Sequence, residues 1–318
     1  MEKRTLGKSE ISIAPLVFGG NVFGWTVDEK TSFTLLDAFF DLGLDCIDTA
    51  DVYSRWVPGN KGGESETIIG NWLKKTGKRN QVVIATKAGS SMNPNDSKKN
   101  LSKNYIIQAA EDSLRRLQID HIDLYQSHYD DLKTPVQETL EAYYQLVKEG
   151  KVRAIGASNF TAERLNESLN ASSEHGLPAY VSLQPEYNLY DREGYENELE
   201  PVCKEKGLGV ITYYSLASGF LTGKYRSEAD LHQSKRGAGI KKYLNERGER
   251  ILKILDEVAH NYTATPAAVA LAWVIARPSV TAPIASATSI SQLQELAKAV
   301  TLKLPQSVID ELTEASSY

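Results

Sequence analysis

The sequence predicts an α/β fold, a (β/α)8 barrel that forms one domain over residues 1–318. Short runs rich in β-branched residues alternate with segments of helical spacing, and eight such runs follow one another in an unbroken series. Several runs are apolar at nearly every position, which is typical of parallel strands covered on both faces. These observations favour a closed barrel over an open doubly wound sheet, the competing architecture.

The expected elements occur at regular intervals along the chain. We expect strands at residues 13–18, 44–48, 82–87, 122–128, 152–158, 181–185, 209–215 and 281–286. The spacing of apolar residues predicts helices at residues 31–42, 64–75, 104–117, 135–148, 162–171, 194–206, 248–260 and 266–276. Residues 305–315 are expected to form a terminal helix that packs across the barrel.

Two long connections interrupt this rhythm. Residues 54–63 are rich in turn-forming residues, and residues 217–245 contain many Gly, Lys and Ser without helical periodicity. Long loops in compact domains are usually functional or disordered. Both follow strands, so both are expected on the C-terminal face of the barrel, where such enzymes have their active sites.

The composition excludes several classes of protein. The net charge is −5 and is spread along the chain, so a nucleic-acid-binding face is not expected. The five His are scattered, which predicts no metal site. Two cysteines give no disulfide framework, and neither a signal peptide nor a run of ~18 apolar residues occurs. We therefore expect a cytoplasmic protein without a membrane or nucleic-acid partner, and the oligomeric state is left open.

Four polar residues stand at or just beyond the ends of three apolar runs. Asp48 ends the run at 44–48 and Tyr53 follows it, while Lys87 ends the run at 82–87 and His128 ends the run at 122–128. Taken alone, each has an ordinary structural role, such as a cap, a core aromatic or a strand-end lysine. Because the carboxyl ends of neighbouring parallel strands meet at one rim, their conjunction favours a site for proton transfer.

The chemistry of these four groups is complementary. A tyrosine acting as an acid near neutrality needs its pKa lowered by about three units, or ~4 kcal/mol. One ammonium about 4 Å away supplies ~4 kcal/mol at an effective dielectric of about 20. We therefore expect Lys87 to lower the pKa of Tyr53, Asp48 to orient Lys87, and His128 to position the substrate oxygen.

Other strand ends predict a bound cofactor. Ser158, Asn159 and Gln184 offer hydroxyl and amide groups that suit a carboxamide. Tyr214 offers a ring for stacking on a flat heterocycle, and the following segment up to Lys224 offers backbone amides and a cation for a pyrophosphate, or simply forms a flexible loop. No GxGxxG follows any strand, so a nicotinamide cofactor is not expected to bind in the Rossmann manner.

At this point the chain resembles the aldo-keto reductases over nearly its whole length, in the order LGKSEISIAPLVFGGN, DTADVY, GGESETIIG, VVIATK, IDLYQSH, GKVRAIGASN and YSLASGFLTGKY. It is most similar to the bacterial branch that resembles potassium-channel β subunits. The resemblance implies a (β/α)8 barrel and NADPH-dependent reduction of an aldehyde or ketone, with Tyr53 as proton donor in the tetrad Asp48, Tyr53, Lys87 and His128. It also implies that the cofactor is bound by Gly20, Asn21, Asp48, Ser158, Asn159, Gln184, Tyr214, Ser215, Leu216, Ser218, Gly219, Leu221 and Lys224.

One departure from the family pattern concerns the 2′-phosphate of NADPH. Members that select NADPH usually carry basic residues in the loop after strand eight and at the start of the next helix. Here Ser286, Thr288 and Gln292 stand in that stretch and are expected to contact the cofactor. Their neutral groups leave the phosphate charge unneutralised, although the Ser and Thr hydroxyls can still hydrogen-bond it. Lys235 or Arg236 in the seventh loop could supply the charge, so NADPH is the expected cofactor and NAD the alternative.

The residues that would contact the substrate are less clearly indicated by the sequence. Trp25, Trp56 and Tyr129 follow the first, second and fourth strands and could wall a substrate pocket, although Trp also anchors loops. The leading hypothesis is a carbonyl reductase acting on a small molecule. The alternatives are a nicotinamide-binding regulatory or partner subunit with slow chemistry, and a barrel enzyme that performs dehydration or epimerisation without net redox change.

Overall fold

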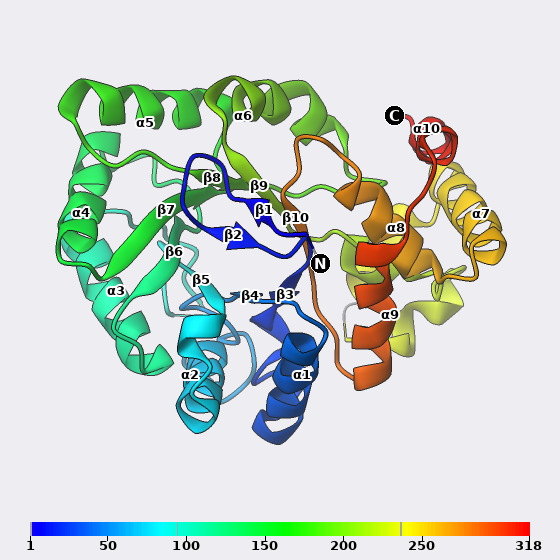
Figure 1. Cartoon of the computed structure of the whole chain (residues 1–318), viewed down its shortest axis with the longest axis horizontal. Helices are drawn as coiled ribbons and strands as arrows, with labels where there is room; N and C mark the ends of the chain where they lie inside the picture. Colours follow the sequence, from blue (N-terminus) through cyan, green and yellow to red (C-terminus); the bar gives the residue numbers. More distant parts are fainter. Residues whose placement is uncertain (1, 94, 236) are drawn as a thin grey trace.

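The computed structural model describes residues 2–93, 95–235 and 237–318. Its centre is a closed barrel of eight parallel strands in the order β10-β3-β4-β5-β6-β7-β8-β9, so the predicted (β/α)8 barrel is confirmed (Figure 1). The barrel strands are β3 (Val17–Gly19), β4 (Cys46–Asp48), β5 (Val83–Ala88), β6 (Ile122–Ser127), β7 (Val152–Ser158), β8 (Ser182–Gln184), β9 (Gly209–Thr212) and β10 (Ala282–Ala285).

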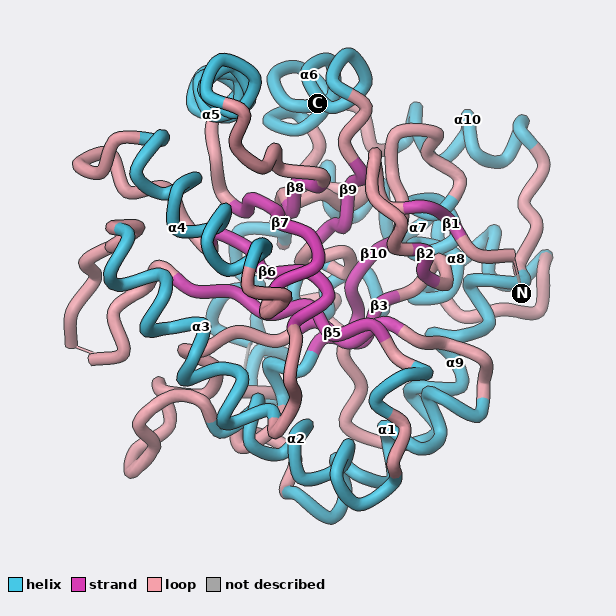
Figure 2. The backbone as a smooth tube through the Cα atoms, turned by 60° about the vertical axis from the view of Figure 1, so that its left-hand side comes forward, coloured by secondary structure: helices cyan, strands magenta, loops and turns pink. Residues whose placement is uncertain are grey.

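Helices surround the barrel on its outside (Figure 2). They are α1 (Glu29–Asp41), α2 (Glu64–Thr76), α3 (Lys103–Leu117), α4 (Val136–Lys148), α5 (Ala162–His175), α6 (Glu200–Lys206), α7 (Glu246–Asn261), α8 (Pro266–Ile275), α9 (Ile290–Thr301) and α10 (Gln306–Ala315). Several begin at a residue whose side chain accepts a hydrogen bond from the first turn, as Asp28, Thr161 and Ser289 do for α1, α5 and α9.

The register brings the polar strand ends to one rim. Asp48 lies opposite Gly19 on one neighbouring strand and Ala85 on the other. Lys87 lies opposite Gln126, and Ser158 lies opposite Gln184. The carboxyl ends of β4 to β8 therefore present their polar side chains side by side.

The first predicted strand, residues 13–18, is wrong as a single element. Ile13 belongs to β2 (Ser12–Ile13), which pairs with β1 (Arg4–Thr5) in an antiparallel hairpin, and only Val17–Gly19 joins the barrel. Pro15 lies between the two pieces and has no N–H to donate to a strand partner. Leu6, Ile11 and Ile13 pack with inward side chains of the barrel strands, so the hairpin plugs the barrel.

The C-terminal helix also differs from expectation. α10 packs on the outside against α7 rather than across the barrel (Figure 1). Buried Arg192 donates to the carbonyl of Thr313, and the indole N–H of Trp273 donates to the Thr313 hydroxyl at 3.0 Å. These contacts fix α10 beside α8 and the start of the 194–206 segment.

Two further segments carry local structure that the sequence did not indicate. The connection at 217–245 contains three short 3-10 helices, η4 (Ala217–Thr222), η5 (Glu228–Gln233) and η6 (Gly237–Tyr243). The predicted helix at 194–206 begins as a π-helix, η3 (Tyr195–Leu199), before α6. Among the described residues, no helix combines the length and apolar character that crossing a membrane requires.

Candidate active site

The four predicted proton-transfer residues meet at the rim of the barrel. Lys87 Nζ lies 2.5 Å from Asp48 Oδ2, 2.8 Å from the carbonyl oxygen of Thr49 and 3.2 Å from Tyr53 Oη. The Tyr53 and His128 rings make edge contact, with centroids 6.0 Å apart. Asp48 and Lys87 are buried, so a fully desolvated ion pair lies directly behind the Tyr53 hydroxyl.

Two amide side chains hold the other oxygen of Asp48. Gln184 Nε2 donates to Asp48 Oδ1 at 2.9 Å, and Gln126 Nε2 donates to the same oxygen at 3.3 Å. Both oxygens of the carboxylate are thus occupied by donors, which a buried charge requires. Gln126 was missed in the sequence; the signal was an amide two residues before His128 in the run at 122–128.

The electrostatics of Tyr53 differ from the expectation that Lys87 lowers its pKa. Burial raises the pKa of Tyr53 above its usual value, and the charge of Lys87 and its hydrogen bond only partly oppose that effect. The ammonium alone does not set this pKa, because the phenol also loses the water around it on burial. Tyr53 is therefore a neutral phenol, the form that can donate a proton.

Lys87 and His128 carry opposite charge states. Burial alone would lower the pKa of Lys87, but Asp48 and Tyr53 more than offset it and raise the pKa, so the ammonium is retained. Burial, together with the charges of Lys87, Lys99 and Arg55, holds the pKa of His128 well below its usual value. His128 is thus a neutral imidazole, and its buried Nδ1 has no hydrogen-bond partner in the described structure.

A second group of buried polar residues lies behind the tetrad. Glu66 accepts hydrogen bonds from Thr86 Oγ1 and Arg116 Nε, both at 2.6 Å. Asp51 is buried and its Oδ1 has no partner, and burial followed by the charge of Glu66 raises its pKa well above the usual value. Since Thr86 precedes Lys87 and the Asp51 N–H donates to the Lys87 carbonyl at 3.0 Å, this group supports the lysine backbone.

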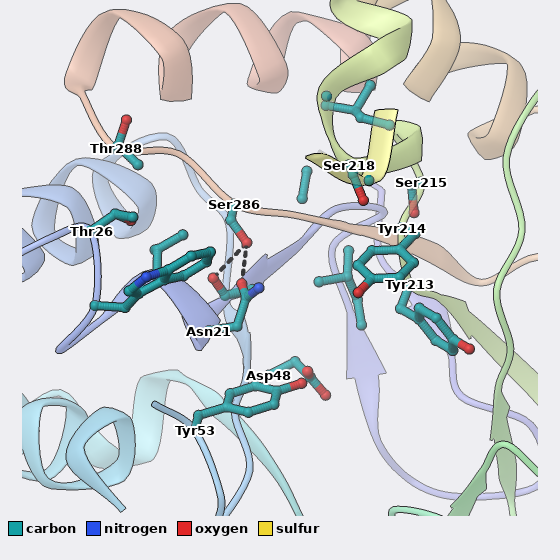
Figure 3. A pocket seen from close by; sticks show the side chains of 18 of the residues that line it. Asn21, Thr26, Asp48, Tyr53, Tyr213, Tyr214, Ser215, Ser218, Ser286 and Thr288 are labelled. Carbon is teal, nitrogen blue, oxygen red and sulfur yellow. Dashed lines mark hydrogen bonds between the residues drawn. The ribbon is translucent and has the colours of Figure 1, made fainter. Parts of the chain in front are cut away.

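A cavity of about 1120 Å³ opens in front of the tetrad, and Figure 3 shows part of its wall. Tyr53 and Asp48 lie together on one side of it, with Tyr213 and Tyr214 on another. Of the residues predicted for catalysis, cofactor or substrate, the following line it: Asn21, Trp25, Asp48, Tyr53, Trp56, His128, Tyr129, Ser158, Asn159, Gln184, Tyr214, Ser215, Leu216, Ser218, Gly219, Lys224, Ser286, Thr288 and Gln292.

A few predicted residues lie elsewhere. Lys87 is behind the wall, as its contacts require, and Leu221 is fully buried in the core. Gly20 faces α2, where its carbonyl accepts a hydrogen bond from Ser65, and the neighbouring Gly19 lines the cavity instead. Arg236 lies outside the described residues.

The amide and hydroxyl groups of β7 and β8 form one connected cluster. Ser158 Oγ donates to the Gln184 carbonyl at 2.9 Å, and Asn159 Nδ2 donates to the His128 carbonyl at 2.9 Å. Tyr213, which also lines the cavity, donates to Asn159 Oδ1 at 2.7 Å. The cluster thereby fixes the orientation of the Asn159 amide beside the tetrad.

The far end of the cavity is bounded by β10, α9 and the 217–245 connection. Ser286 Oγ donates to the Gly19 carbonyl at 2.8 Å and contacts Asn21 Oδ1 at 2.7 Å (Figure 3). Thr288 donates to Gln292 Oε1 through both its N–H and its hydroxyl. Lys235 also lines the cavity, so a cation is present where the sequence placed one.

The cavity wall contains residues that the sequence did not single out. They include Gly19 at the end of β3, Glu295 on α9, and, in the connections, Val22, Thr26, Val52, Arg55, Ser90, Lys99, Tyr213, Thr222, Ser234 and Thr265. Arg55 sits within the 54–63 loop, one of the two long connections expected on the C-terminal face. The others carried no local signal, because their position depends on how the loops fold.

A closed (β/α)8 barrel with such a cavity at the carboxyl ends of its strands defines an enzyme of the barrel class. The family model described as "Aldo/keto reductase family" matches residues 15–317, so the chain belongs to the aldo/keto reductase family and is an oxidoreductase.

Similar proteins agree with this assignment. The chain is 36% identical to the uncharacterized oxidoreductase YrpG of Bacillus subtilis, over 99% of this chain and 95% of that protein. It is 34% identical to the aldo-keto reductase YhdN of the same organism, over 91% of this chain and 84% of that protein. It is 33% identical to a probable voltage-gated potassium channel subunit beta of Arabidopsis thaliana, over 94% of this chain and 91% of that protein.

Proposed function

We propose that the protein reduces an aldehyde or ketone to an alcohol with NADPH, Tyr53 being the proton donor. In the balanced reaction, a carbonyl compound, NADPH and a proton give an alcohol and NADP⁺. The observation that carries the proposal is the contact of Lys87 Nζ with both Asp48 and Tyr53 in a buried site that opens on the cavity. This arrangement presents one proton where an alkoxide would develop.

The cavity residues fit a nicotinamide dinucleotide in the chemistry of their donor sets. Asn159 and Gln184 are amides beside the tetrad, and the half-exposed Tyr214 offers a ring face. Ala217, Ser218 and Gly219 all have positive φ, so the backbone turns tightly at the wall next to Lys224. Tight turns of this kind and a nearby cation are suited to phosphate oxygens.

The residues of the tetrad divide the chemistry between them. When bound, the nicotinamide supplies the hydride that reaches the carbonyl carbon. Tyr53 donates its phenolic proton to the carbonyl oxygen, and the Lys87 ammonium stabilises the negative charge left on the phenol oxygen. Asp48 keeps Lys87 charged and in place. His128 Nε2, as part of a neutral imidazole, orients the carbonyl oxygen by a hydrogen bond.

The substitution Tyr53→Phe tests the mechanism. Loss of the donor is expected to lower kcat by about 10²–10⁴-fold, while binding of NADPH, measured by fluorescence, is kept. Phe retains the ring that packs against Trp56 and His128, so the fold is expected to survive. Reductase activity near that of the parent protein would contradict the role of Tyr53.

The preference for NADPH rests on Lys224 and Lys235, which line the cavity, and on the hydroxyls of Ser286 and Thr288. A ratio of kcat/KM values that favours NADPH is expected for one carbonyl substrate. A ratio that is equal or favours NADH would overturn the choice of cofactor while leaving the reductase assignment intact.

A second candidate function is a nicotinamide-binding partner subunit with slow reductase chemistry. It is favoured by the 33% identity to a protein named as a probable potassium channel subunit beta. Co-purification with a membrane channel, together with negligible turnover over a broad panel of carbonyl compounds, would support it. The complete tetrad favours an enzyme that acts on small-molecule carbonyl compounds. We infer that this enzyme is cytoplasmic, because its two cysteines are buried and free, as is common in a reducing compartment.

A further inference from the structure

Besides Lys224 and Lys235, which lie toward the far end, two cationic side chains line the cavity without a carboxylate partner in the described structure. Arg55 lies in the loop after β4, and Lys99 lies in the connection between β5 and α3. Within the described parts of the chain, neither forms an ion pair within 4.0 Å. Arg55 Nη1 donates to the Asn93 carbonyl at 3.4 Å, and Lys99 Nζ donates to Ser90 Oγ at 3.3 Å. Both charges are therefore available to a ligand.

Ring contacts place these cations at the tetrad end of the cavity. Lys99 Nζ lies 3.8 Å from the centroid of the Tyr129 ring. Tyr129 stacks on His128 at 4.8 Å, and His128 contacts Tyr53. Lys99 is thus separated from the proposed proton donor by two rings.

Arg55 flanks the same end from the other loop. It directly precedes Trp56, whose ring contacts Tyr53 at 5.9 Å and Trp25 at 5.7 Å. Arg55 and Lys99 therefore both line the tetrad end of the cavity, and both charges act on His128 beside the aromatic wall made of Trp25, Trp56 and Tyr129.

The acids along the cavity do not cancel this charge. The described lining residues include two carboxylates, Asp48 and Glu295. Asp48 is paired with Lys87, and Glu295 lies on α9 at the far end, where it pairs with Lys298 at 2.7 Å. Asp96 does not line the cavity; it accepts a hydrogen bond from the Lys98 backbone N–H, and its charge acts on Arg55 without an ion pair within 4.0 Å in the described structure. The tetrad end is therefore net positive.

We propose that the substrate is a carbonyl compound that carries an anionic group, a carboxylate or a phosphate, bound by Arg55 and Lys99 while its apolar body packs on the aromatic wall. The inference rests on the proposed function, because it names the substrate class for that site. Unpaired cations at a partly dehydrated wall attract anions by charge-assisted hydrogen bonds. A neutral carbonyl compound would leave both cations without a partner.

A matched pair of aldehydes tests the proposal. We measure kcat/KM for para-formylbenzoate and for its neutral methyl ester in the parent protein and in Arg55→Gln, Lys99→Gln and Lys98→Gln. The ratio of acid to ester is expected to fall roughly tenfold in each of the first two variants. Lys98 is exposed and does not line the cavity, so Lys98→Gln is expected to keep the parent ratio. Raising salt from about 0.05 to about 0.5 M is expected to lower the parent ratio as well.

Two further measurements separate the possible outcomes. Binding of the acid and the ester, followed by tryptophan fluorescence, reports the charge preference even if neither aldehyde is reduced. If neither aldehyde is reduced, preferred binding of the acid that is lost in Arg55→Gln and Lys99→Gln would support the anion site and count against the reductase assignment. Reduction of both aldehydes with a ratio that the variants do not change would overturn the anion site and leave the reductase assignment standing. Glyceraldehyde phosphate compared with glyceraldehyde distinguishes a phosphate from a carboxylate.

Discussion

At the scale of single residues, the site depends on a phenol that remains protonated. Burial raises the pKa of Tyr53, and Lys87 opposes this effect without reversing it. Lys87 therefore acts less by ionising the phenol in advance than by stabilising the charge that appears when the proton leaves. Such stabilisation is strong because the ammonium is fixed by Asp48 and is fully buried.

The pH dependence of reduction follows from this assignment. A group whose pKa is raised keeps its proton over a wider range, so Tyr53 remains an acid up to and beyond pH ~10. We expect kcat/KM for reduction to be level between about pH 7 and about pH 9 and to fall only at higher pH. A steady-state pH series with one aldehyde measures this profile. A decline centred near neutrality would show that Lys87 dominates over burial.

Asp51 offers a separate test of the buried polar group. Its pKa is raised in the folded protein, so the folded state binds more protons than the unfolded state between the unfolded pKa near ~3.9 and the higher folded pKa. The contribution of Asp51 to the free energy of unfolding is fully present below that pH range and is lost as the pH rises through it. Asp51→Asn removes the dependence with little change of shape.

We therefore expect Asp51→Asn to gain free energy of unfolding relative to the parent protein as the pH rises from about 5 to about 8, by at least 1 kcal/mol. Urea unfolding at the two pH values measures the difference. Asp41→Asn, at an exposed carboxylate at the end of α1, is the control and is expected to show no such change. Equal pH dependence in Asp51→Asn and the parent protein would contradict a raised pKa for Asp51.

At the scale of elements, the packing of α2 on α3 depends on a glycine. A Cβ added to Gly70 in α2 would lie 2.3 Å from the carbonyl oxygen of Arg116 in α3. The close approach holds α2, which carries Glu66, against the helix that carries Arg116. Alanine would normally favour a helix by up to about 1 kcal/mol, but here the clash with backbone opposes that gain.

Gly70→Ala is accordingly expected to lower the free energy of unfolding by about 1–3 kcal/mol. Gly194 provides the matched control, because it has helical φ and ψ and its added Cβ would meet nothing within 4 Å. Gly194→Ala is expected to raise the free energy of unfolding by about 0.5–1 kcal/mol. Denaturant unfolding compares the two, and a stabilising Gly70→Ala would mean that the helices separate without cost.

The barrel and the tetrad could be predicted because they follow from the order of apolar and polar residues along the chain and from a general rule of parallel barrels. Asp48, Lys87 and His128 end apolar runs, and parallel strands bring such ends to one rim. The hairpin that plugs the barrel could not be predicted in this way. It depends on Gly7, whose added Cβ would lie 2.1 Å from the carbonyl oxygen of Val181, a contact between distant segments.

The site residues that the sequence did not predict were missed for the same reason, because their roles depend on contacts between distant segments. Gln126 is one of three polar residues in β6, and its role appears only when Asp48 is seen beside it. Asp51 was not singled out in the sequence, but the fold buries it next to Glu66. Arg55 and Lys99 come from loops whose paths no periodicity describes, so their meeting at the tetrad required the structure.

At the scale of the whole molecule, the cavity joins segments from both ends of the chain. Residues at or just beyond the ends of all eight barrel strands, β3 to β10, line it, so a dinucleotide bound there would bridge the N-terminal and C-terminal halves across the β10–β3 seam. A ligand that binds only the folded state stabilises it by about 2.7 kcal/mol at a concentration 100 times its Kd. Because so many segments contribute, that stabilisation is expected to act on unfolding of the barrel as a unit.

We therefore expect saturating NADPH to raise Tm by several degrees, and NADH at the same concentration to raise it less. Lys224→Gln is expected to reduce the shift with either cofactor, because this cation lines the cavity where the pyrophosphate is proposed to bind. Lys74→Gln, at an exposed position of α2, removes the same charge away from the cavity and is expected to keep the parent shift. Thermal unfolding followed by circular dichroism measures the Tm of the three proteins without cofactor and with each of the two cofactors. A shift that is the same in Lys224→Gln as in Lys74→Gln would place the pyrophosphate elsewhere, and no shift with either cofactor would reject nicotinamide binding in this cavity.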